Sequence, residues 1–203
     1  MLFLIRHGET DWNADRRLQG QIDTGLNGRG RAQAREAAHT LCAVAADITS
    51  TAFLSSPLTR TRETLEILMG ELVTMGRLTE PKPCTTDARL MELSFGCWEG
   101  LTWKEVRRKD QGDSAARNAD IWNVAPPGGE SYAQLASRAG PLLASLAPGA
   151  AVVAHGGITR VALKLFAGIA PERAAKVPIR QGDVLVVENG EARWGSGATL
   201  DGA

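Results

Sequence analysis

The sequence has few cysteines and no long apolar segment. Its three cysteines, Cys42, Cys84 and Cys97, form neither a close pair nor an even set, so we expect reduced thiols and no disulfide framework. The apolar run 1–5 is interrupted at once by Arg6 and is too short for a signal-peptide core. No later stretch approaches the ~20 apolar residues of a membrane span. These absences predict a cytoplasmic protein with no membrane-bound segment.

The sequence also lacks an excess of charge of either sign. Its 23 Lys and Arg residues balance 23 Asp and Glu residues, so it has no broad basic field for binding nucleic acid or anionic membranes. Hydrophobic residues at 43% and charged residues at 23% are typical of globular proteins. At 203 residues, the length favours one domain over residues 1–203. Any anion site must therefore be local.

Short apolar runs alternate with segments of helical periodicity. Such runs are typical of strands buried on both faces of a parallel sheet, and their alternation with helices predicts an α/β layered fold. Strands are predicted at 2–5, 51–54, 150–154, 184–187 and 192–194, and helices at 31–46, from Ser56-Pro57 onward, at 132–146 and from Ile158 onward. The last two strands are expected to form a hairpin around Asn189-Gly190.

Two stretches show little periodicity. The polar, glycine-containing stretch 11–30 predicts a long functional loop, and Asn27 within it can cap the helix that follows. The region 70–125 is irregular and includes a polar segment from Lys104 to Asp120. We expect an insertion around residues 93–130 that covers the substrate.

Two of the three histidines occupy matching positions just past buried strands. His7 follows the first apolar run, His155 follows the run 150–154, and glycine comes next in both cases. Ligands of α/β sheets bind beyond the carboxyl ends of strands, and glycine lets backbone N–H groups approach an anion. Arg6 adds a planar fork of donors suited to phosphate. A single histidine is more often structural, but two in matched settings favour a phosphate site.

A set of short motifs spans nearly the whole chain. It comprises Arg6-His7-Gly8-Glu9-Thr10, Trp12-Asn13, Arg17, Gln19-Gly20, Asp23-Thr24-Gly25-Leu26, Gly30, Gln33-Ala34, residues 55–60, residues 90–96, residues 127–131 and Ala154-His155-Gly156-Gly157. In this order the set resembles the histidine phosphatase superfamily, which includes the phosphoglycerate mutases. The resemblance implies a three-layer α/β sandwich, with a mostly parallel central sheet flanked by helices. Thr24-Gly25 departs from the family's proline or serine before leucine but removes no catalytic group.

The resemblance also implies a role for each matching residue. His7 would be the nucleophile that becomes phosphorylated, and Glu92 would donate a proton to the leaving oxygen. The catalytic residues that would surround the phosphoryl oxygens are Arg6, Arg60 and His155. Further phosphate- or substrate-binding positions are Asn13, Gln19, Gly20 and Gly156.

The chemistry of phosphoryl transfer agrees with these roles. Its transition state needs positioning and positive donors, which two arginines and a second imidazole supply without a metal. We therefore predict a metal-independent enzyme without a cofactor. His7 must be neutral to attack, and the nearby cations Arg6 and Arg60 disfavour its protonation. Its other ring nitrogen needs an acceptor, such as a backbone carbonyl.

Several residues compete with these assignments. Glu99 and Glu105 lie close to Glu92 in sequence, and Arg62 competes with Arg60, although helix face and motif spacing favour Arg60.

Two further features have alternative interpretations. Trp98, Trp103 and Trp122 either line a substrate cleft or, more commonly, pack in the core. The basic run 107–109 either forms a solvated surface or attracts a second anionic group of the substrate.

The predicted function is hydrolysis of a small phosphorylated metabolite through a phosphohistidine at His7. A phosphoglycerate mutase is the alternative, although members of that branch generally carry a longer insertion and tail than the roughly 37 residues found here between Glu92 and Glu130. A phospho-ligand sensor without turnover is a third possibility, disfavoured because nucleophile and acid are both present. The substrate, with α-ribazole phosphate and small sugar phosphates among the options, and the oligomeric state stay open.

Overall fold

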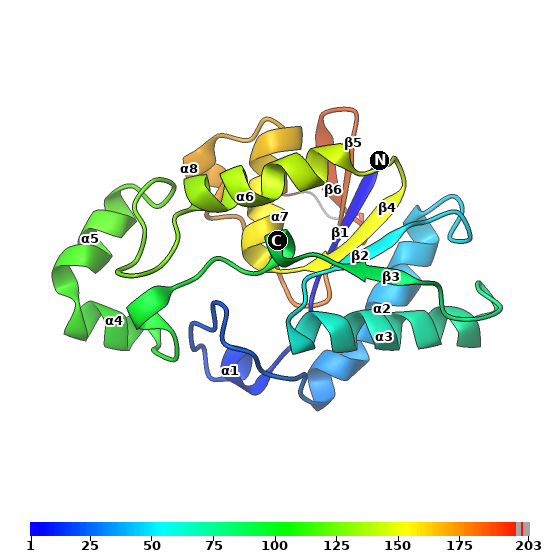
Figure 1. Cartoon of the computed structure of the whole chain (residues 1–203), viewed down its shortest axis with the longest axis horizontal. Helices are drawn as coiled ribbons and strands as arrows, with labels where there is room; N and C mark the ends of the chain where they lie inside the picture. Colours follow the sequence, from blue (N-terminus) through cyan, green and yellow to red (C-terminus); the bar gives the residue numbers. More distant parts are fainter. Residues whose placement is uncertain (198–199, 201–203) are drawn as a thin grey trace.

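A single sheet forms the centre of the protein, whose computed structural model describes residues 1–197 and 200. In this part of the chain, six strands lie in the order β3-β2-β4-β1-β5-β6 (Figure 1). They are β1 (Leu2–Arg6), β2 (Phe53–Ser55), β3 (Cys84–Thr86), β4 (Ala150–Ala154), β5 (Val184–Glu188) and β6 (Glu191–Trp194). The first four are parallel to one another, and β5 runs antiparallel to β1 and β6.

Helices cover both faces of this sheet. They are α1 (Asp11–Ala14), α2 (Gly28–Val44), α3 (Thr59–Thr74), α4 (Trp103–Lys109), α5 (Gln111–Ala119), α6 (Tyr132–Ser145), α7 (Gly156–Phe166) and α8 (Pro171–Ala174), with 3-10 turns η1 (Ala88–Leu90) and η2 (Gly96–Trp98). Helices α2 and α3 pack on one face, and α6, α7 and α8 lie on the other (Figure 1). The predicted three-layer α/β fold with a mostly parallel sheet is confirmed.

The wholly apolar strands contribute to two separate cores. Successive side chains of a strand point to opposite faces of its sheet. Phe3 and Ile5 of β1 therefore pack with buried residues of α2 and α3, whereas Leu4 and Val152 pack with buried residues of α6 and α7. Both faces need apolar side chains, which explains why β1 and β4 show no polar alternation.

Three predicted helix starts differ from the structure. The helix predicted from residue 31 begins earlier, because the Asn27 side chain accepts a hydrogen bond from Gly30 N (2.9 Å). Helix α3 begins at Thr59, not at Ser56-Pro57, because Ser56 instead hydrogen-bonds a histidine of the site. Helix α7 begins two residues before Ile158, directly after its N-cap His155.

The C-terminal hairpin matches its prediction. Glu188 pairs with Glu191 across Asn189-Gly190, whose φ angles of 51° and 83° suit the tight turn between antiparallel strands.

The sequence did not predict β3, because this edge strand is polar, exposed and preceded by prolines. The predicted strand 51–54 is displaced slightly, to Phe53–Ser55. Helix α1 also went unpredicted, because one capped turn carries no apolar periodicity.

The segment expected as an insertion contains η2, α4 and α5, and it lies beyond one end of the sheet (Figure 1). Hydrogen bonds attach it to the 11–30 loop: Gly100 N donates to Leu18 O (2.8 Å), and Leu18 N donates to Leu101 O (2.9 Å). Leu18 also packs with Trp98 and Val106 in a small core. The segment is thereby held in place beside the loop. In the part of the chain that the structure describes, no helix has the length and apolarity of a membrane span.

Candidate active site

His7 and His155 lie side by side at the carboxyl ends of β1 and β4. The register places Arg6 opposite Ala154, and His7 N donates to Ala154 O (3.0 Å). The two rings meet edge to face, with centroids 5.2 Å apart and an interplanar angle of 63°. Both side chains are buried. Parallel pairing of two strands thus brings together residues 148 positions apart in the sequence.

The ring of His7 is oriented by its own backbone neighbour. Nδ1 lies 2.7 Å from Gly8 O, and because a carbonyl can only accept, Nδ1 holds the proton and Nε2 keeps its lone pair. Burial, followed by the charges of Arg6 and Arg60, lowers the pKa of His7 well below its ordinary value. His7 is therefore a neutral imidazole with a free Nε2, and the expected backbone acceptor is the Gly8 carbonyl.

His155 is also kept neutral, but its hydrogen bonding is incomplete. Its Nε2 lies 2.9 Å from Ser56 Oγ, whereas Nδ1 is buried without a hydrogen-bond partner among the described residues. Burial lowers the pKa of His155 well below its ordinary value, and Arg60 and His7 add to the effect. Because an unpaired buried nitrogen is costly, Nδ1 is available to a bound ligand.

Arg6 and Arg60 are buried cations held by backbone carbonyls. Arg6 Nη1 donates to Ile179 O, and Arg60 donates to Ile22 O (2.8 Å) and Gly20 O (2.7 Å). The Nε atoms of both have no hydrogen-bond partner in the described part of the chain. Burial lowers the pKa of Arg6 to about 10 and also lowers that of Arg60, so both stay charged near neutrality. Such buried charges favour an anionic ligand.

Glu92 is fixed against the first turn of α7. Its Oε1 accepts hydrogen bonds from Leu93 N (2.9 Å) and Gly157 N (3.1 Å), and Oε2 lies 3.3 Å from Gly157 N. A Cβ atom at residue 157 would lie 2.2 Å from Oε1. Only glycine at that position leaves room for the carboxylate.

The alternative candidates for the positions of Glu92 and Arg60 lie elsewhere or have structural roles. Glu99 Oε1 accepts from Gln21 N (3.1 Å) and Phe95 N (3.0 Å), which holds two loops together. Glu105 completes the capping box of α4. Arg62 is exposed, whereas Arg60 is 1% exposed. The geometry favours Glu92 and Arg60.

The loop residues of the predicted site divide into two groups. Asn13 lines the cavity, and its Oδ1 accepts from Thr10 N (3.2 Å), so its amide nitrogen is the end left for a ligand. Gln19 uses both ends of its amide inside the loop, donating to Thr10 Oγ1 (2.6 Å) and accepting from Thr24 Oγ1 (2.9 Å). Gly20 supplies the carbonyl that holds Arg60. Gln19 and Gly20 therefore shape the loop.

Gly156 leaves space for two guanidinium groups. A Cβ atom there would lie 3.3 Å from Arg160 Nη1 and 3.7 Å from Arg6 Cζ. These two arginines thus converge at the start of α7, and Arg160 was not predicted from the sequence.

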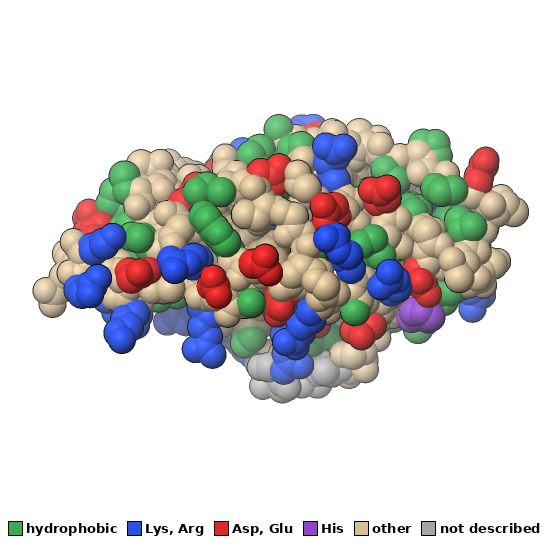
Figure 2. Space-filling view, turned by 90° about the horizontal axis from the view of Figure 1, so that it is seen from below, with side chains coloured by type: hydrophobic (Ala, Val, Ile, Leu, Met, Phe, Trp, Pro, Cys, Tyr) green, Lys and Arg blue, Asp and Glu red, His purple; other side chains and the backbone are tan. Residues whose placement is uncertain are grey.

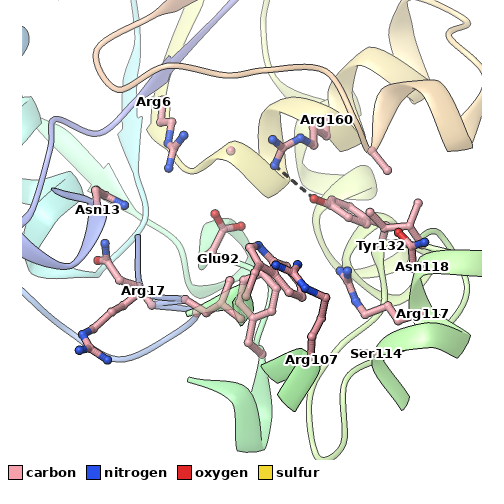
Figure 3. A pocket seen from close by; sticks show the side chains of 18 of the residues that line it. Arg6, Asn13, Arg17, Glu92, Arg107, Ser114, Arg117, Asn118, Tyr132 and Arg160 are labelled. Atoms are coloured by element: carbon pink, nitrogen blue, oxygen red, sulfur yellow. Dashed lines mark hydrogen bonds between the residues drawn. The ribbon is translucent and has the colours of Figure 1, made fainter. Parts of the chain in front are cut away.

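Every site residue predicted from the sequence except His155 lines a cavity of about 880 Å³ (Figure 3). Among the residues described, six arginines line it and Glu92 is its one carboxylate: the arginines are Arg6, Arg17, Arg60, Arg107, Arg117 and Arg160. Within the described residues no group of three His, Cys, Asp or Glu side chains is placed to hold a metal ion. The cavity is strongly cationic.

The structure separates the alternatives for the aromatic residues. Trp103 lines the cavity. Trp98 is buried and donates to Asp110 Oδ2 (2.8 Å), and Trp122 is buried and stacks on Tyr132 with centroids 5.5 Å apart.

Of the basic run 107–109, only Arg107 lines the cavity. The other two members are exposed. Figure 2 shows the Lys and Arg side chains gathered at the end of the molecule that α4 and α5 occupy.

A neutral buried imidazole, unpaired buried guanidinium nitrogens and one carboxylate around a cationic cavity define an enzyme site for phosphoryl transfer. The chain belongs to the histidine phosphatase superfamily (branch 1), which it matches over residues 2–198.

Relatives of two kinds share this similarity. A 2,3-bisphosphoglycerate-dependent phosphoglycerate mutase of Bradyrhizobium diazoefficiens is 32% identical, over 92% of this chain and 90% of its own length. A glucosyl-3-phosphoglycerate phosphatase of Mycolicibacterium vanbaalenii is 36% identical, over 77% of this chain and 69% of its own. The solved structure of a mycobacterial glucosyl-3-phosphoglycerate phosphatase with VO3 superposes with a TM-score of 0.76 at 29% identity, covering 95% and 96% of the two chains.

Proposed function

We propose that this enzyme hydrolyses a phosphomonoester of a small metabolite through a phosphohistidine at His7. The observation that carries the proposal is the state of His7, whose Nδ1 donates to Gly8 O while Nε2 is unprotonated. This nitrogen is a nucleophile without prior loss of a proton. It stands beside Arg6 and Arg60, whose unpaired Nε atoms suit the oxygens of a transferring phosphoryl group.

The first step transfers the phosphoryl group to the enzyme. His7 Nε2 attacks phosphorus, a P–N bond forms and the ester P–O bond breaks. Arg6, Arg60 and Asn13 bind the phosphoryl oxygens, beside the ring of His155 that packs against His7. Glu92 gives a proton to the departing oxygen.

The second step restores the enzyme. Water attacks the phosphorus of phosphohistidine, the carboxylate of Glu92 takes one of its protons, and the P–N bond breaks to release inorganic phosphate. His7 is neutral again, and Glu92 has regained the proton that it gave up in the first step. The segment 93–130 would cover the substrate during both steps, which its place beside the cavity supports.

The arginines support a mechanism that needs no metal ion. Metals in phosphoryl transfer neutralise charge that builds on the phosphoryl oxygens, and here buried guanidinium groups supply positive charge at the same place. Turnover is therefore expected to be unchanged when chelator is added.

Phosphoglycerate mutase activity is a second candidate, because several relatives carry that name and two of them are matched over 90% of their length. That coverage also means that chain length does not separate the two classes. A direct assay for interconversion of 2- and 3-phosphoglycerate decides between them.

The central experiment is rapid-quench labelling with a ³²P-labelled monoester. An acid-labile, alkali-stable phosphate on the wild-type chain, absent from His7→Ala, is the expected result. His39→Ala is the matched control, because His39 is exposed on α2. Undiminished turnover by His7→Ala would refute the proposal. Binding of monoesters without hydrolysis of any would instead indicate a phospho-ligand sensor.

We also propose a cytoplasmic location, with small phosphorylated molecules as the binding partners. The reduced-thiol interpretation of its cysteines supports this location, and the balanced charge supports partners other than nucleic acid or a membrane. Fractionation of the host cell, with the chain detected by antibody, tests it.

A further inference from the structure

The backbone that follows His7 is held by side chains of two helices. Helices α2 and α3 pack on the same face of the sheet (Figure 1). Gln33 on α2 and Thr64 on α3 have no role in the proposed phosphoryl transfer, yet each accepts a hydrogen bond from a backbone N–H next to the nucleophile. These two contacts bear on the state of the His7 ring.

Gln33 reaches the peptide group that orients His7. The Gly8 carbonyl and the Glu9 N–H belong to one planar trans peptide group and point in opposite directions. Glu9 N donates to Gln33 Oε1 (2.8 Å), while Gly8 O lies 2.7 Å from His7 Nδ1. The Gln33 amide therefore fixes the plane of the carbonyl that accepts the Nδ1 proton. Its hydrogen bond also polarises the peptide group, which makes the Gly8 carbonyl a better acceptor.

Two glycines allow α2 to approach this peptide group closely. A Cβ atom on Gly8 would lie 2.2 Å from Gly30 O, and a Cβ atom on Gly30 would lie 2.1 Å from Glu9 O. Gly30 belongs to the first turn of α2, and Gln33 lies three residues further along the same side of the helix. Backbone contact at Gly30 thus places the Gln33 side chain within reach of Glu9 N.

Thr64 fixes the preceding peptide group. Its side chain is fully buried, and its Oγ1 accepts from Gly8 N (3.0 Å) and donates to Arg60 O (2.7 Å). These roles follow because a backbone N–H only donates and a carbonyl only accepts. A bond from threonine to the carbonyl four residues earlier is common in helices. The bond from Gly8, which lies 56 positions away, links the backbone of the nucleophile to the helix that carries Arg60.

These contacts decide between two neutral forms of His7. A neutral imidazole carries one proton, on Nδ1 or on Nε2, and the hydrogen bond made by one nitrogen selects the form. With the proton on Nε2, this nitrogen has no free lone pair with which to attack phosphorus. Gly8 O is the acceptor that keeps the proton on Nδ1. A rotation of its peptide group would therefore allow the proton to move to Nε2.

We propose that Gln33 and Thr64 are positioning residues, which hold the peptide groups on either side of Gly8 so that His7 keeps its proton on Nδ1 and presents Nε2 as the nucleophile. Both act through the backbone, and neither belongs to the lining of the cavity. The inference rests on the proposed function and adds to it a support for the nucleophile that lies outside the cavity.

The form of the His7 ring is measured on the free enzyme. In protein labelled with ¹⁵N-histidine, long-range ¹H–¹⁵N correlation NMR near neutral pH distinguishes a protonated ring nitrogen from an unprotonated one. Spectra of His39→Gln and His155→Gln identify the His7 signals by elimination. The wild type is expected to show Nδ1–H. Gln33→Met and Thr64→Val remove the accepting oxygen at similar size and should populate the Nε2–H form.

Conservative variants test whether the accepting oxygen is what matters. Gln33→Glu and Thr64→Ser each keep an oxygen that can accept the backbone N–H, so both should restore the Nδ1–H form. In rapid-quench experiments with a saturating ³²P-labelled monoester, Gln33→Met and Thr64→Val should form phosphohistidine about five- to tenfold more slowly than the wild type, as loss of one hydrogen bond predicts. KM of Gln33→Met should be unchanged, because Gln33 does not line the cavity.

Two matched controls remove similar hydrogen bonds elsewhere. Gln134→Met removes an amide oxygen that accepts from Ser131 N (2.7 Å) in the cap of α6. Thr74→Val removes a threonine hydroxyl that donates to Gly70 O (2.9 Å) within α3. Both control variants should keep the Nδ1–H form of His7.

The two measurements separate failure of this inference from failure of the proposed function. A wild type that forms no phosphohistidine, but whose ring responds to the variants as expected, would overturn only the hydrolase. Slower variants that keep the Nδ1–H form, variants with the wild-type rate, or a wild-type ring protonated on Nε2 would overturn the positioning role. If Thr64→Val does not fold, as judged by circular dichroism, Gln33→Met decides, because Gln33 is half-buried on the surface of α2.

Discussion

His7 and His155 meet edge to face with their ring centroids 5.2 Å apart, at the ends of two neighbouring parallel strands. The pKa of each ring is lowered, because each is buried and both lie near the charges of Arg6 and Arg60. One ring presents a free Nε2 and the other an unpaired Nδ1. Both histidines are therefore neutral in the folded protein, and their neutrality affects the stability of the protein in acid as well as the reactivity of His7.

The first prediction concerns stability in mild acid. The folded pKa of each buried histidine lies below its unfolded value, so below about pH 6.5 the unfolded chain binds more protons, and the free energy of unfolding falls as pH decreases. Each histidine contributes a slope of at most about 1.4 kcal/mol per pH unit. Urea unfolding between pH 5 and 8 should give a shallower slope for His155→Gln than for the wild type. The exposed His39→Gln is the control, and equal slopes for wild type and His155→Gln would contradict the prediction.

The second prediction tests Glu92 as the proton donor. Glu92→Gln keeps the size of the side chain but supplies no acidic proton, so alkyl phosphates should be hydrolysed about 10²–10⁴-fold more slowly. p-Nitrophenyl phosphate should be affected much less, because its leaving oxygen hardly needs a proton. Steady-state kinetics with both substrates measures the difference. Glu105→Gln, which alters the cap of α4, controls for the loss of a carboxylate in this region. An equal loss on both substrates would argue against the acid role.

The third prediction concerns the space beside Glu92. In Gly157→Ala the new methyl group would lie 2.2 Å from Glu92 Oε1, so the carboxylate must move away from the first turn of α7. We expect Gly157→Ala, like Glu92→Gln, to lose more activity on alkyl phosphates than on p-nitrophenyl phosphate. Steady-state kinetics with the same two substrates measures the difference. Gly70→Ala on α3 is the control, because nothing lies within 4 Å of its added Cβ. A Gly157→Ala enzyme with wild-type rates would show that this position of the carboxylate is dispensable.

The fourth prediction concerns Arg138, which positions the turn that carries Glu92. Its guanidinium donates to Glu130 Oε1 (2.9 Å) and Oε2 (2.7 Å), and to the carbonyls of Arg89 (2.8 Å) and Met91 (3.2 Å). Arg138→Met should lower the free energy of unfolding by about 2 kcal/mol, because a half-buried carboxylate loses its partner. It should also reduce kcat for alkyl phosphates more than for p-nitrophenyl phosphate.

Two variants test the role assigned to Arg138. Arg138→Lys keeps the positive charge but lacks the planar guanidinium that binds both oxygens of Glu130. It should therefore recover only part of the kcat that Arg138→Met loses. Arg89→Met removes an exposed arginine from the same turn and should leave the kinetics unchanged. A loss of stability in Arg138→Met without any change in leaving-group dependence would limit Arg138 to a structural role.

The strands β1 and β4 and the hairpin were predictable because their signals are local. An unbroken apolar run indicates burial on both faces, and Asn189-Gly190 indicates a turn with positive φ angles. The start of α3 was wrong, because Ser56 has a cap-type side chain but uses it to hydrogen-bond His155, which lies 99 positions away. Edge strand β3 left no apolar pattern because both of its faces are exposed.

The sequence by itself determined the apolar strands, the long amphipathic helices, the family motifs and the pair of histidines that follow buried strands, because each depends on residues that are neighbours in the sequence. Only the tertiary structure decided that Arg117, Tyr132 and Arg160, from α5, α6 and α7, share one cavity with His7. It also decided that Glu99 holds two loops together through hydrogen bonds, whereas Glu92 accepts a hydrogen bond from the first turn of α7. The physical reason is that charge compensation and hydrogen bonding depend on distances in space, and side chains on separate helices leave no periodic signal along the chain.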